Sequence, residues 1–247
     1  SSDLELVKYT LTVDRVILGT AADDTIAGDV AVGFIDAKGG NDTVVGSDGD
    51  EEILGGVGDD TISGAGGNDV IVDSQGNNIL SGDAGDDLIN ISGVGEMLAE
   101  PARNPTAQID GGDGRDTLKV AGQVDWSNVT VENVEVLDGS GGISLLTAQE
   151  ILDKGFTSAQ NIVFGLDQNQ SDGEIDASGL AGALTLRGTN QSDSLIGNDD
   201  DNTIHLLNDN DSGAGRGVDA VTAGGGDDII NWDMIGHSNW NRNFSSV

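Results

Sequence analysis

The sequence lacks cysteine and is poor in proline, aromatic and basic residues: of 247 residues, two are Pro, eight are Phe, Trp or Tyr, and ten are Lys or Arg. Without cysteine there can be no disulfide framework and no thiolate metal site. No run of about 18 apolar residues occurs, so we expect no membrane insertion. The 44 Asp and Glu residues outnumber the basic ones, and the formal net charge is −34. Such an acidic chain repels phosphates, which excludes nucleic acid and anionic lipid as partners.

In contrast to those scarce residues, Asp and Gly are abundant. Of the acidic residues 35 are Asp and nine are Glu, and 39 residues are Gly. Helices favour Glu, whereas Asp hydrogen-bonds nearby backbone and prefers turns and caps. A hydrophobic share of 36% is too high for a solvated, disordered tail. The composition therefore predicts a folded chain of one large domain or two, rich in turns and in oxygen ligands.

A nine-residue repeat organises these residues. Six nonapeptides run without a gap from residue 37 to residue 90, reading AKGGNDTVV, GSDGDEEIL, GGVGDDTIS, GAGGNDVIV, DSQGNNILS and GDAGDDLIN. In all six, position four is Gly, position six is Asp, Asn or Glu, and position eight is Val, Ile or Leu. Further copies occur at 19–27, 111–119, 188–196, 197–205, 214–222 and 223–231, whereas 28–36 keeps only its apolar Ile35. A fixed period of this kind indicates a solenoid of stacked turns.

These repeats resemble the RTX (repeats-in-toxin) family of calcium-binding nonapeptide repeats, whose consensus is G-G-x-G-x-D-x-U-x with U a large aliphatic residue. The resemblance covers roughly 19–90, 111–119 and 188–231. It implies an all-β fold, a parallel β-roll or β-helix solenoid in which two nonapeptides make one 18-residue turn. It also implies several bound Ca²⁺ ions and type I export of an unfolded polypeptide, and hence a secreted, extracellular or cell-surface location.

The repeat itself predicts the core of such a roll. The glycines of the first six positions allow positive φ and a tight loop. The last three positions alternate, so that position eight faces the interior while its neighbours face outward. We therefore expect a thin aliphatic core made by Ile26, Val44, Ile62 and Leu80 on one sheet and by Ile53, Ile71 and Ile89 on the other. A core this thin does not by itself balance the chain entropy lost on folding.

The carboxylates at position six are the candidate metal ligands. Stacking places Asp24, Asp42, Asp60 and Asn78 on one edge and Glu51, Asp69 and Asp87 on the other. The later repeats add Asp116, Asp193, Asn202, Asp219 and Asp228 to these candidates. Carboxylates beside glycine carbonyls form a set of hard oxygen ligands that suits Ca²⁺ better than Mg²⁺. Zinc is a poor fit, because the chain has no cysteine and only two histidines.

The alternative for any one motif is a metal-free Asx-turn. Repeats in unbroken register favour calcium, since stacked like charges would keep the roll from closing without cations. Glu51 is longer than the usual Asp and Asn78 lacks a charge, so these two are the weakest candidates. Binding should be coupled to folding, because the sites exist only when the turns stack.

Four regions follow from the pattern: an N-terminal β-roll block at 1–90, a protruding loop at 91–110, a degenerate solenoid at 111–187, and a C-terminal repeat block with its tail at 188–247. Within the degenerate region, the alternation of 129–138 and of 182–188 predicts strands. A capping box that starts at Thr147 and a stop at Gly155 predict a short helix over 148–154.

The chain carries no H-E-x-x-H, no G-x-S-x-G, no cysteine nucleophile and no phosphate loop with its lysine, so we expect no enzyme activity in it. We expect instead a calcium-binding segment of a secreted bacterial structural or cell-surface protein: an adhesin, surface-layer or extracellular filament component. Its partners would be calcium and either further copies of itself or a cell-surface glycan. The alternatives are the C-terminal module of an exported protease, lipase or polysaccharide epimerase, and a carbohydrate- or ice-binding module.

The outer face of one predicted sheet bears on self-association. Leu54, Val70, Val72 and Leu88 should point outward from it and form an apolar patch. Either the 145–156 helix or the 91–110 loop covers this patch, or it is a contact between subunits.

Overall fold

The protein is a parallel β-solenoid, described here by a computed structural model over residues 15–29, 32–73, 75–91, 107–120, 129–139, 148–165, 173–189, 192–207 and 219–233. All recorded strand pairs in these ranges are parallel and only one helix interrupts them, which confirms the predicted fold class. The chain divides into two compact units, Ser1–Leu118 with Ser127–Val134 and Lys119–Trp126 with Glu135–Val247. The division into four regions with boundaries at residues 90, 110 and 187, made from the sequence, stays a prediction. Within the described part of the chain, no helix is long and apolar enough to cross a membrane.

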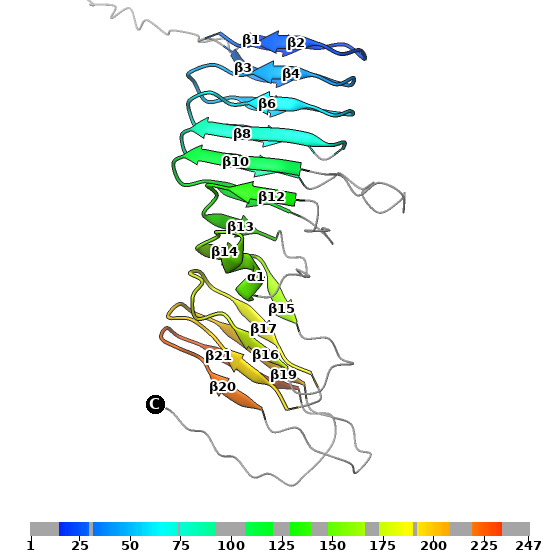
Figure 1. Cartoon of the computed structure of the whole chain (residues 1–247). Helices are drawn as coiled ribbons and strands as arrows, with labels where there is room; N and C mark the ends of the chain where they lie inside the picture. The colour runs from blue at the N-terminus through cyan, green and yellow to red at the C-terminus, as the bar shows by residue number, and fades with distance from the viewer. Residues whose placement is uncertain are drawn as a thin grey trace, which may run out of the picture. The chain divides into compact units, whose positions relative to one another are not determined.

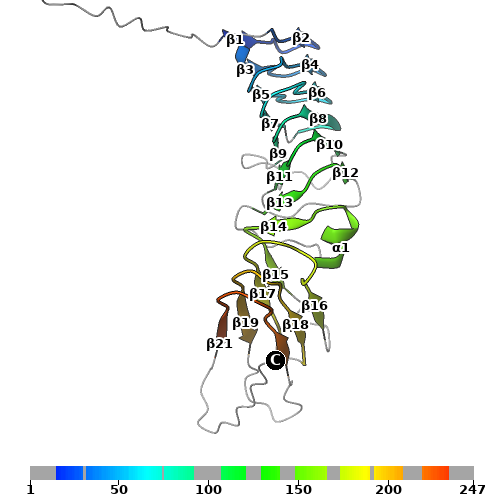
Figure 2. The ribbon, with the colours of Figure 1, turned by 90° about the vertical axis from the view of Figure 1, so that its left-hand side faces the viewer.

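The first unit is made of two parallel sheets, one of odd-numbered and one of even-numbered strands, stacked as successive rungs (Figure 1) and seen on opposite sides in the turned view (Figure 2). One sheet holds β1 (Arg15–Leu18), β3 (Val32–Asp36), β5 (Glu52–Leu54), β7 (Val70–Val72), β9 (Leu88–Asn90) and β11 (Thr117–Lys119). The other holds β2 (Thr25–Ala27), β4 (Thr43–Val45), β6 (Thr61–Ser63), β8 (Asn78–Ala84), β10 (Ala107–Asp113) and β12 (Val129–Glu132).

The register of these sheets repeats every 18 residues and sets the core. Val44 pairs with Ile26 on one side and with Ile62 on the other. Ile53 and Ile71 pair in the same way on the opposite sheet. All seven expected core residues are buried, with exposed fractions of 8% for Ile26 and at most 1% for the others. The predicted core is therefore confirmed.

Glycine at position four allows the turns to stack closely. Gly58 and Gly76 have φ of +139° and +123°, in the region that side chains rarely adopt. A Cβ on Gly76 would overlap the carbonyl oxygen of Gly58 in the turn before it. The invariant glycine of the repeat thus serves both the turn and the contact between neighbouring turns.

The end of the predicted 91–110 loop is a strand. Residues 107–110 begin β10, where Ile109 pairs with Leu80 of β8 and is 2% exposed. The short alternating sequence before Gly111 is enough to add a rung, because it places Ile109 over the existing core. Residues 92–106 lie outside the described residues.

The second unit contains two further parallel sheets and the helix. One sheet has the order β15 (Val163–Gly165), β17 (Thr185–Arg187), β19 (Thr203–Leu207) and β21 (Ile229–Asp233). The other has the order β16 (Glu174–Asp176), β18 (Ser194–Ile196) and β20 (Ala220–Thr222), and β13 (Val136–Asp138) pairs with β14 (Ser158–Gln160). Helix α1 (Ala148–Asp153) lies within the predicted range, and its Ile151 is fully buried.

The prediction of one strand over 129–138 was wrong. The segment forms two strands, β12 and β13, in different sheets, and Asn133 between them has φ of +51°. Asn adopts this left-handed conformation more readily than other side chains do. The apolar alternation shifts by one residue at this turn, from Val129 and Val131 to Val134 and Val136, and that shift is the sequence signal of the break.

Candidate metal centres

The position-six side chains of the first unit form a ladder along each edge. Oδ1 of Asp42 accepts a hydrogen bond from the backbone N–H of Asp24, and Oδ1 of Asp60 accepts one from that of Asp42, both at 2.8 Å. Oδ1 of Asn78 accepts from the N–H of Asp60 at 3.0 Å. The other edge continues in the same way, at 2.7 to 2.8 Å, through Glu51, Asp69, Asp87 and Asp116. This is the arrangement that an 18-residue turn predicts, and the insertion before β10 does not interrupt it.

The second carboxylate oxygen, Oδ2, is buried and accepts no hydrogen bond in Asp42, Asp60, Asp69 and Asp87, residues that are 1–2% exposed, and Oδ2 of Asp116 is buried in the same way. An ionised carboxylate buried in this way carries a large desolvation cost unless a cation or a proton compensates it. We call the loops of these four residues (37–42, 55–60, 64–69 and 82–87) the open loops.

Backbone carbonyl oxygens lie beside the bare oxygens of the open loops. A Cβ on Gly64 would touch Oδ2 of Asp69 and lie 2.7 Å from the carbonyl oxygen of Gly82 in the next turn. A Cβ on Gly82 would likewise meet Oδ2 of Asp87 and lie 2.5 Å from the carbonyl oxygen of Gly111. Position one therefore needs glycine in the loops of Asp69 and Asp87, since a side chain would fill the space that a carboxylate and a carbonyl oxygen share.

The pKa values of several position-six carboxyl groups reflect the same crowding of oxygens. Burial, together with the nearby carboxylates of Asp87 and Glu51, raises the pKa of Asp69 to about 7, against a backbone hydrogen bond that lowers it. Burial is also the main cause of the raised pKa of Asp60, of Asp87 and of Asp219. These carboxylates are poorly stabilised as anions by the protein alone.

The donor set of the open loops fits calcium. Each loop presents a carboxylate oxygen and carbonyl oxygens, which are hard ligands in a flexible arrangement. Among the described residues, no three His, Cys, Asp or Glu side chains gather at one point. A cation would therefore take ligands from one or two carboxylates and from the backbone.

The other predicted residues have different surroundings, and those of the second unit form separate pairs. The carboxylates of Asp24, Glu51 and Asp193 accept hydrogen bonds within their own loops. In the second unit, Oδ1 of Asp219 accepts from the N–H of Asp193 at 3.1 Å, and Oδ1 of Asp228 accepts from that of Asn202 at 2.9 Å. The assignment of all these residues as metal ligands stays a proposal.

Asp73 is a buried carboxylate that the repeat analysis missed. It occupies position one of its repeat, where the neighbouring repeats have glycine, and it is 2% exposed. Its Oδ2 borders Gly55, and its carboxyl group interacts with that of Asp60. The same repeat has the neutral Asn78 at position six, so Asp73 restores the charge that Asn78 lacks. The sequence signal that could have identified Asp73 is an acidic residue at a repeat position that is glycine in the neighbouring repeats.

Position five forms a second, exposed ladder that the repeat analysis also missed. Side-chain oxygens of Asp23, Asn41 and Asp59 accept, at 2.8 Å, the backbone N–H of the position-five residue one turn later. On the other edge, Asp50, Asn68 and Asp86 bond the N–H of the next turn at 2.7 to 2.9 Å. Asp and Asn alternate along both edges, which keeps like charges from stacking directly on one another.

Comparison with known proteins agrees with this geometry. The family model of the RTX calcium-binding nonapeptide repeat matches residues 34–62, 63–90 and 179–212, in four copies. The first two matches contain all four open loops. The repeat at 111–119 lies outside the matched residues, although Asp116 extends the position-six ladder. No curated protein matches the chain.

Proposed function

We propose that this chain, which carries RTX calcium-binding nonapeptide repeats, is a β-roll segment of a secreted structural or cell-surface protein that folds when it binds calcium outside the cell. An adhesin, a surface-layer component or an extracellular filament is the role we propose for the whole protein. The single observation that carries the calcium dependence is the row of buried Oδ2 atoms, in Asp42, Asp60, Asp69 and Asp87, which accept no hydrogen bond.

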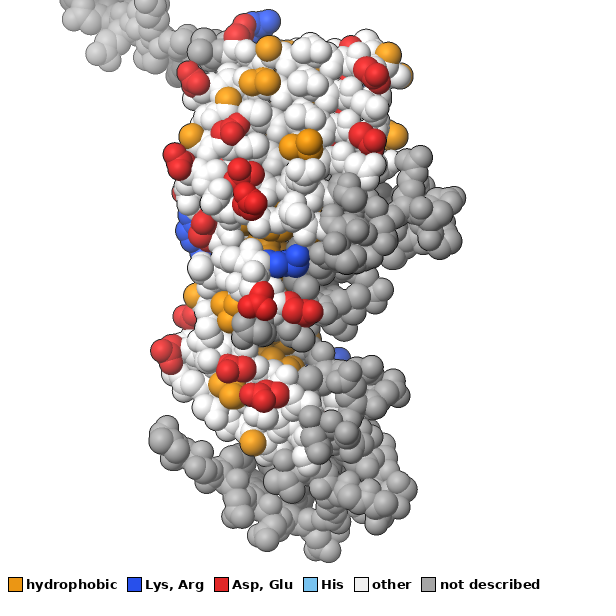
Figure 3. Space-filling model, in the orientation of Figure 1, with side chains coloured by type: hydrophobic (Ala, Val, Ile, Leu, Met, Phe, Trp, Pro, Cys, Tyr) orange, Lys and Arg blue, Asp and Glu red, His pale blue; other side chains and the backbone are white. Residues whose placement is uncertain are grey.

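The charge of the chain supports folding outside the cell. Figure 3 displays acidic side chains spread down one face of the first unit, with single hydrophobic side chains between them. The ion pairs Arg15–Asp29 and Lys38–Asp36 involve carboxylates outside position six, so these two bases leave the ladder uncompensated. Extracellular calcium modules bind at about 10⁻⁴–10⁻³ M, which keeps such sites empty in the cytoplasm. RTX repeats are typical of type I secreted proteins, whose chains are exported unfolded.

The proposed function predicts that calcium removal unfolds the chain. Far-ultraviolet circular dichroism of the full chain at neutral pH should change from disordered in EDTA to β-rich at millimolar calcium. The same concentration of magnesium should restore much less β signal, because magnesium demands stricter octahedral geometry and loses its waters reluctantly. A chain that is equally β-rich in EDTA and in calcium would contradict this function.

The structural role makes a separate prediction about assembly. Sedimentation velocity of the calcium-loaded chain should reveal species larger than the monomer, which disappear when calcium is chelated. A monomer at all protein concentrations in calcium would argue against a surface-layer or filament role, and binding to a glycan array would then favour an adhesin.

A further inference from the structure

The residue at position two has a backbone conformation that is common to the four open loops and is shared by Gly112 and Gly224 of two later repeats. In the open loops this residue has positive φ, whether or not it is glycine: 82° at Lys38, 108° at Gly56, 78° at Ala65 and 70° at Asp83. The position-six Oδ2 of all four loops accepts no hydrogen bond. A left-handed non-glycine residue is uncommon, so three of them at one repeat position point to a shared conformational requirement.

Three other loops have Ser or Thr at position two, without positive φ. The backbone N–H and the hydroxyl of Thr20 donate to Oδ2 of Asp24 at 2.6 and 2.9 Å. Thr189 makes the same pair of bonds to Oδ2 of Asp193, at 2.5 and 2.9 Å. In the third loop the N–H of Ser47 donates to Oε2 of Glu51 at 2.8 Å, and its hydroxyl bonds Oε1.

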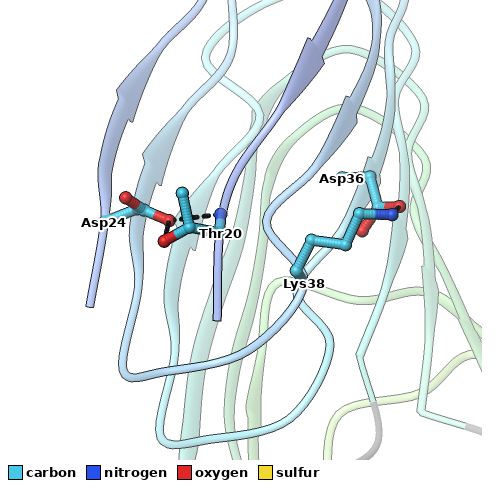
Figure 4. Close-up of polar contacts among 4 residues, drawn as sticks. All are labelled: Thr20, Asp24, Asp36 and Lys38. Carbon is cyan, nitrogen blue, oxygen red and sulfur yellow. Dashed lines mark hydrogen bonds and ion pairs between the residues drawn. The ribbon is translucent and has the colours of Figure 1, made fainter. Parts of the chain in front are cut away.

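Figure 4 contrasts the two kinds of position-two residue in consecutive turns. Thr20 points toward Asp24 and both of its donors reach one carboxylate oxygen. Lys38 occupies the equivalent position one turn later, but its side chain extends to Asp36 instead. The ammonium group of Lys38 therefore does not reach Oδ2 of Asp42, and that oxygen accepts no hydrogen bond.

Asn202 marks a third arrangement, in which an amide occupies the space beside the carbonyls. Its Nδ2 donates to the carbonyl oxygens of Asn198, Asp200 and Ala223 at 3.2, 2.7 and 3.2 Å. These carbonyls belong to positions two and four of the same loop and to position one of the next turn. The three oxygens thus converge on the place that a carboxylate oxygen takes in an Asp loop.

We propose that the chain has two kinds of loop: open loops that take a calcium ion, and closed loops in which a hydroxyl at position two or an amide at position six replaces that ion. Among the loops whose position two is described, those of Asp24, Glu51, Asp193 and Asn202 are closed. In the loops of Asp24, Glu51 and Asp193 the carboxylate accepts N–H and O–H donors of the chain itself. In the loop of Asn202 the amide Nδ2 donates to the converging carbonyl oxygens, although its Oδ1 accepts no hydrogen bond. In both cases donors of the chain offset oxygen–oxygen repulsion where an open loop needs a cation. The number of bound ions is then smaller than the number of repeats.

This proposal rests on the proposed function and is tested by exchanging Asp and Asn, which have the same shape. Asp69→Asn replaces a bare oxygen with an amide donor, so the variant should bind one calcium ion fewer per chain and fold more readily without calcium. Asn202→Asp makes the opposite change, so it should bind one ion more and fold less readily without calcium. Equilibrium dialysis against saturating calcium with metal analysis gives the count, and circular dichroism in calcium-free buffer gives the folded fraction.

Matched variants keep the outcome clear. Asp86→Asn makes the same exchange at exposed position five, and Ala65→Gly changes an open loop at position two without adding a donor, so both should bind the wild-type number of ions. If Asn202→Asp does not fold in calcium, Thr189→Gly replaces it; removing the hydroxyl and freeing the backbone should open that loop and add one ion.

The two proposals fail in different ways. A wild-type chain that binds no calcium overturns the proposed function and this inference together. A wild-type chain that binds calcium while Asp69→Asn, or the folded loop-opening variant, keeps the wild-type count overturns the inference alone.

Discussion

Each carboxylate of an open loop has two oxygens in different surroundings. One oxygen of Asp69 holds the N–H of Glu51 and so joins two turns, while the other faces carbonyl oxygen without a donor. The hydrogen bond stabilises the stacking of the turns, whereas repulsion between the bare oxygen and the carbonyl oxygen opposes it until a cation or a proton binds. A single residue therefore couples the assembly of the turns to the ion.

The calcium-free chain should fold better in acid than at neutral pH. Asp69 has a pKa of about 7 in the folded chain, against about 3.9 for an unfolded Asp. A raised folded pKa means that the stabilising contribution is complete below about pH 4 and is lost as the pH rises toward 7. Circular dichroism in calcium-free buffer should therefore report more β structure at pH 5 than at pH 8.

The variant Asp69→Asn is the control for this pH dependence, since it removes one of the titrating groups and should flatten the curve. Acidification also lowers the overall charge, and that effect is common to both chains. A calcium-free chain that loses β structure between pH 8 and pH 5 would contradict the assignment.

Each strand of the first unit contributes very little core on its own. Most are three residues long, with one buried side chain between two outward ones, as in β7 with Ile71. The outward apolar residues Leu54, Val70, Val72 and Leu88 are partly exposed. Such short strands gain stability only by stacking, so loss of one core side chain affects the turns on both sides of it.

We expect Ile71→Ala to destabilise the calcium-loaded chain by about 3 kcal/mol, the usual cost of truncating a buried aliphatic side chain. Ile71 is fully buried and its pairing partners are Ile53 and Ile89. Ile79→Ala is the matched control, because Ile79 is 46% exposed and its truncation should cost within about 0.5 kcal/mol. Urea unfolding at saturating calcium measures both, and equal effects would disprove the assigned core.

Across the whole molecule, acidic charge and the solenoid repeat act together. The net charge of −34 opposes compaction, and only the loops provide places where cations can sit close to several oxygens. Turns in a solenoid are stabilised mainly by their neighbours, so one ordered turn prepares the next. Backbone bonds to positions five and six join the successive turns between residue 23 and residue 116.

Calcium-induced folding should consequently be cooperative. A calcium titration followed by circular dichroism should rise more steeply than a single-site hyperbola, with a Hill coefficient clearly above 1. The variant Asp60→Ala, which removes the ladder oxygen Oδ1 and the bare oxygen Oδ2 in the middle of one edge, should shift the midpoint to higher calcium and lower the steepness. A hyperbolic titration of the wild-type chain would mean that the loops fill independently.

The resemblance to RTX repeats implied the parallel solenoid and its 18-residue turn. Given that turn, the nine-residue period was enough to predict the seven core residues and the assignment of position-six residues to two edges. These features depend only on spacing, because an 18-residue turn brings equivalent positions into register whatever the loops contain. The strand that begins at Ala107 was not predictable in this way, since it depends on how a short segment meets the rung before it. The break at Asn133 lies outside the nine-residue repeat, and its only signal is a one-residue shift in the apolar alternation.

The sequence by itself therefore determined which residues form the core and which carboxylates stand at the loops. Only the tertiary structure decided which of those carboxylates are left without donors. That outcome depends on the backbone conformation at position two, which turns the donors of Thr20 toward Asp24 and leaves Asp42 without one. It depends also on groups from other turns, such as Asp73 beside Asp60 and the carbonyl of Ala223 beside Asn202. Hydrogen bonds are directional and short-ranged, so residue type and spacing alone do not specify them.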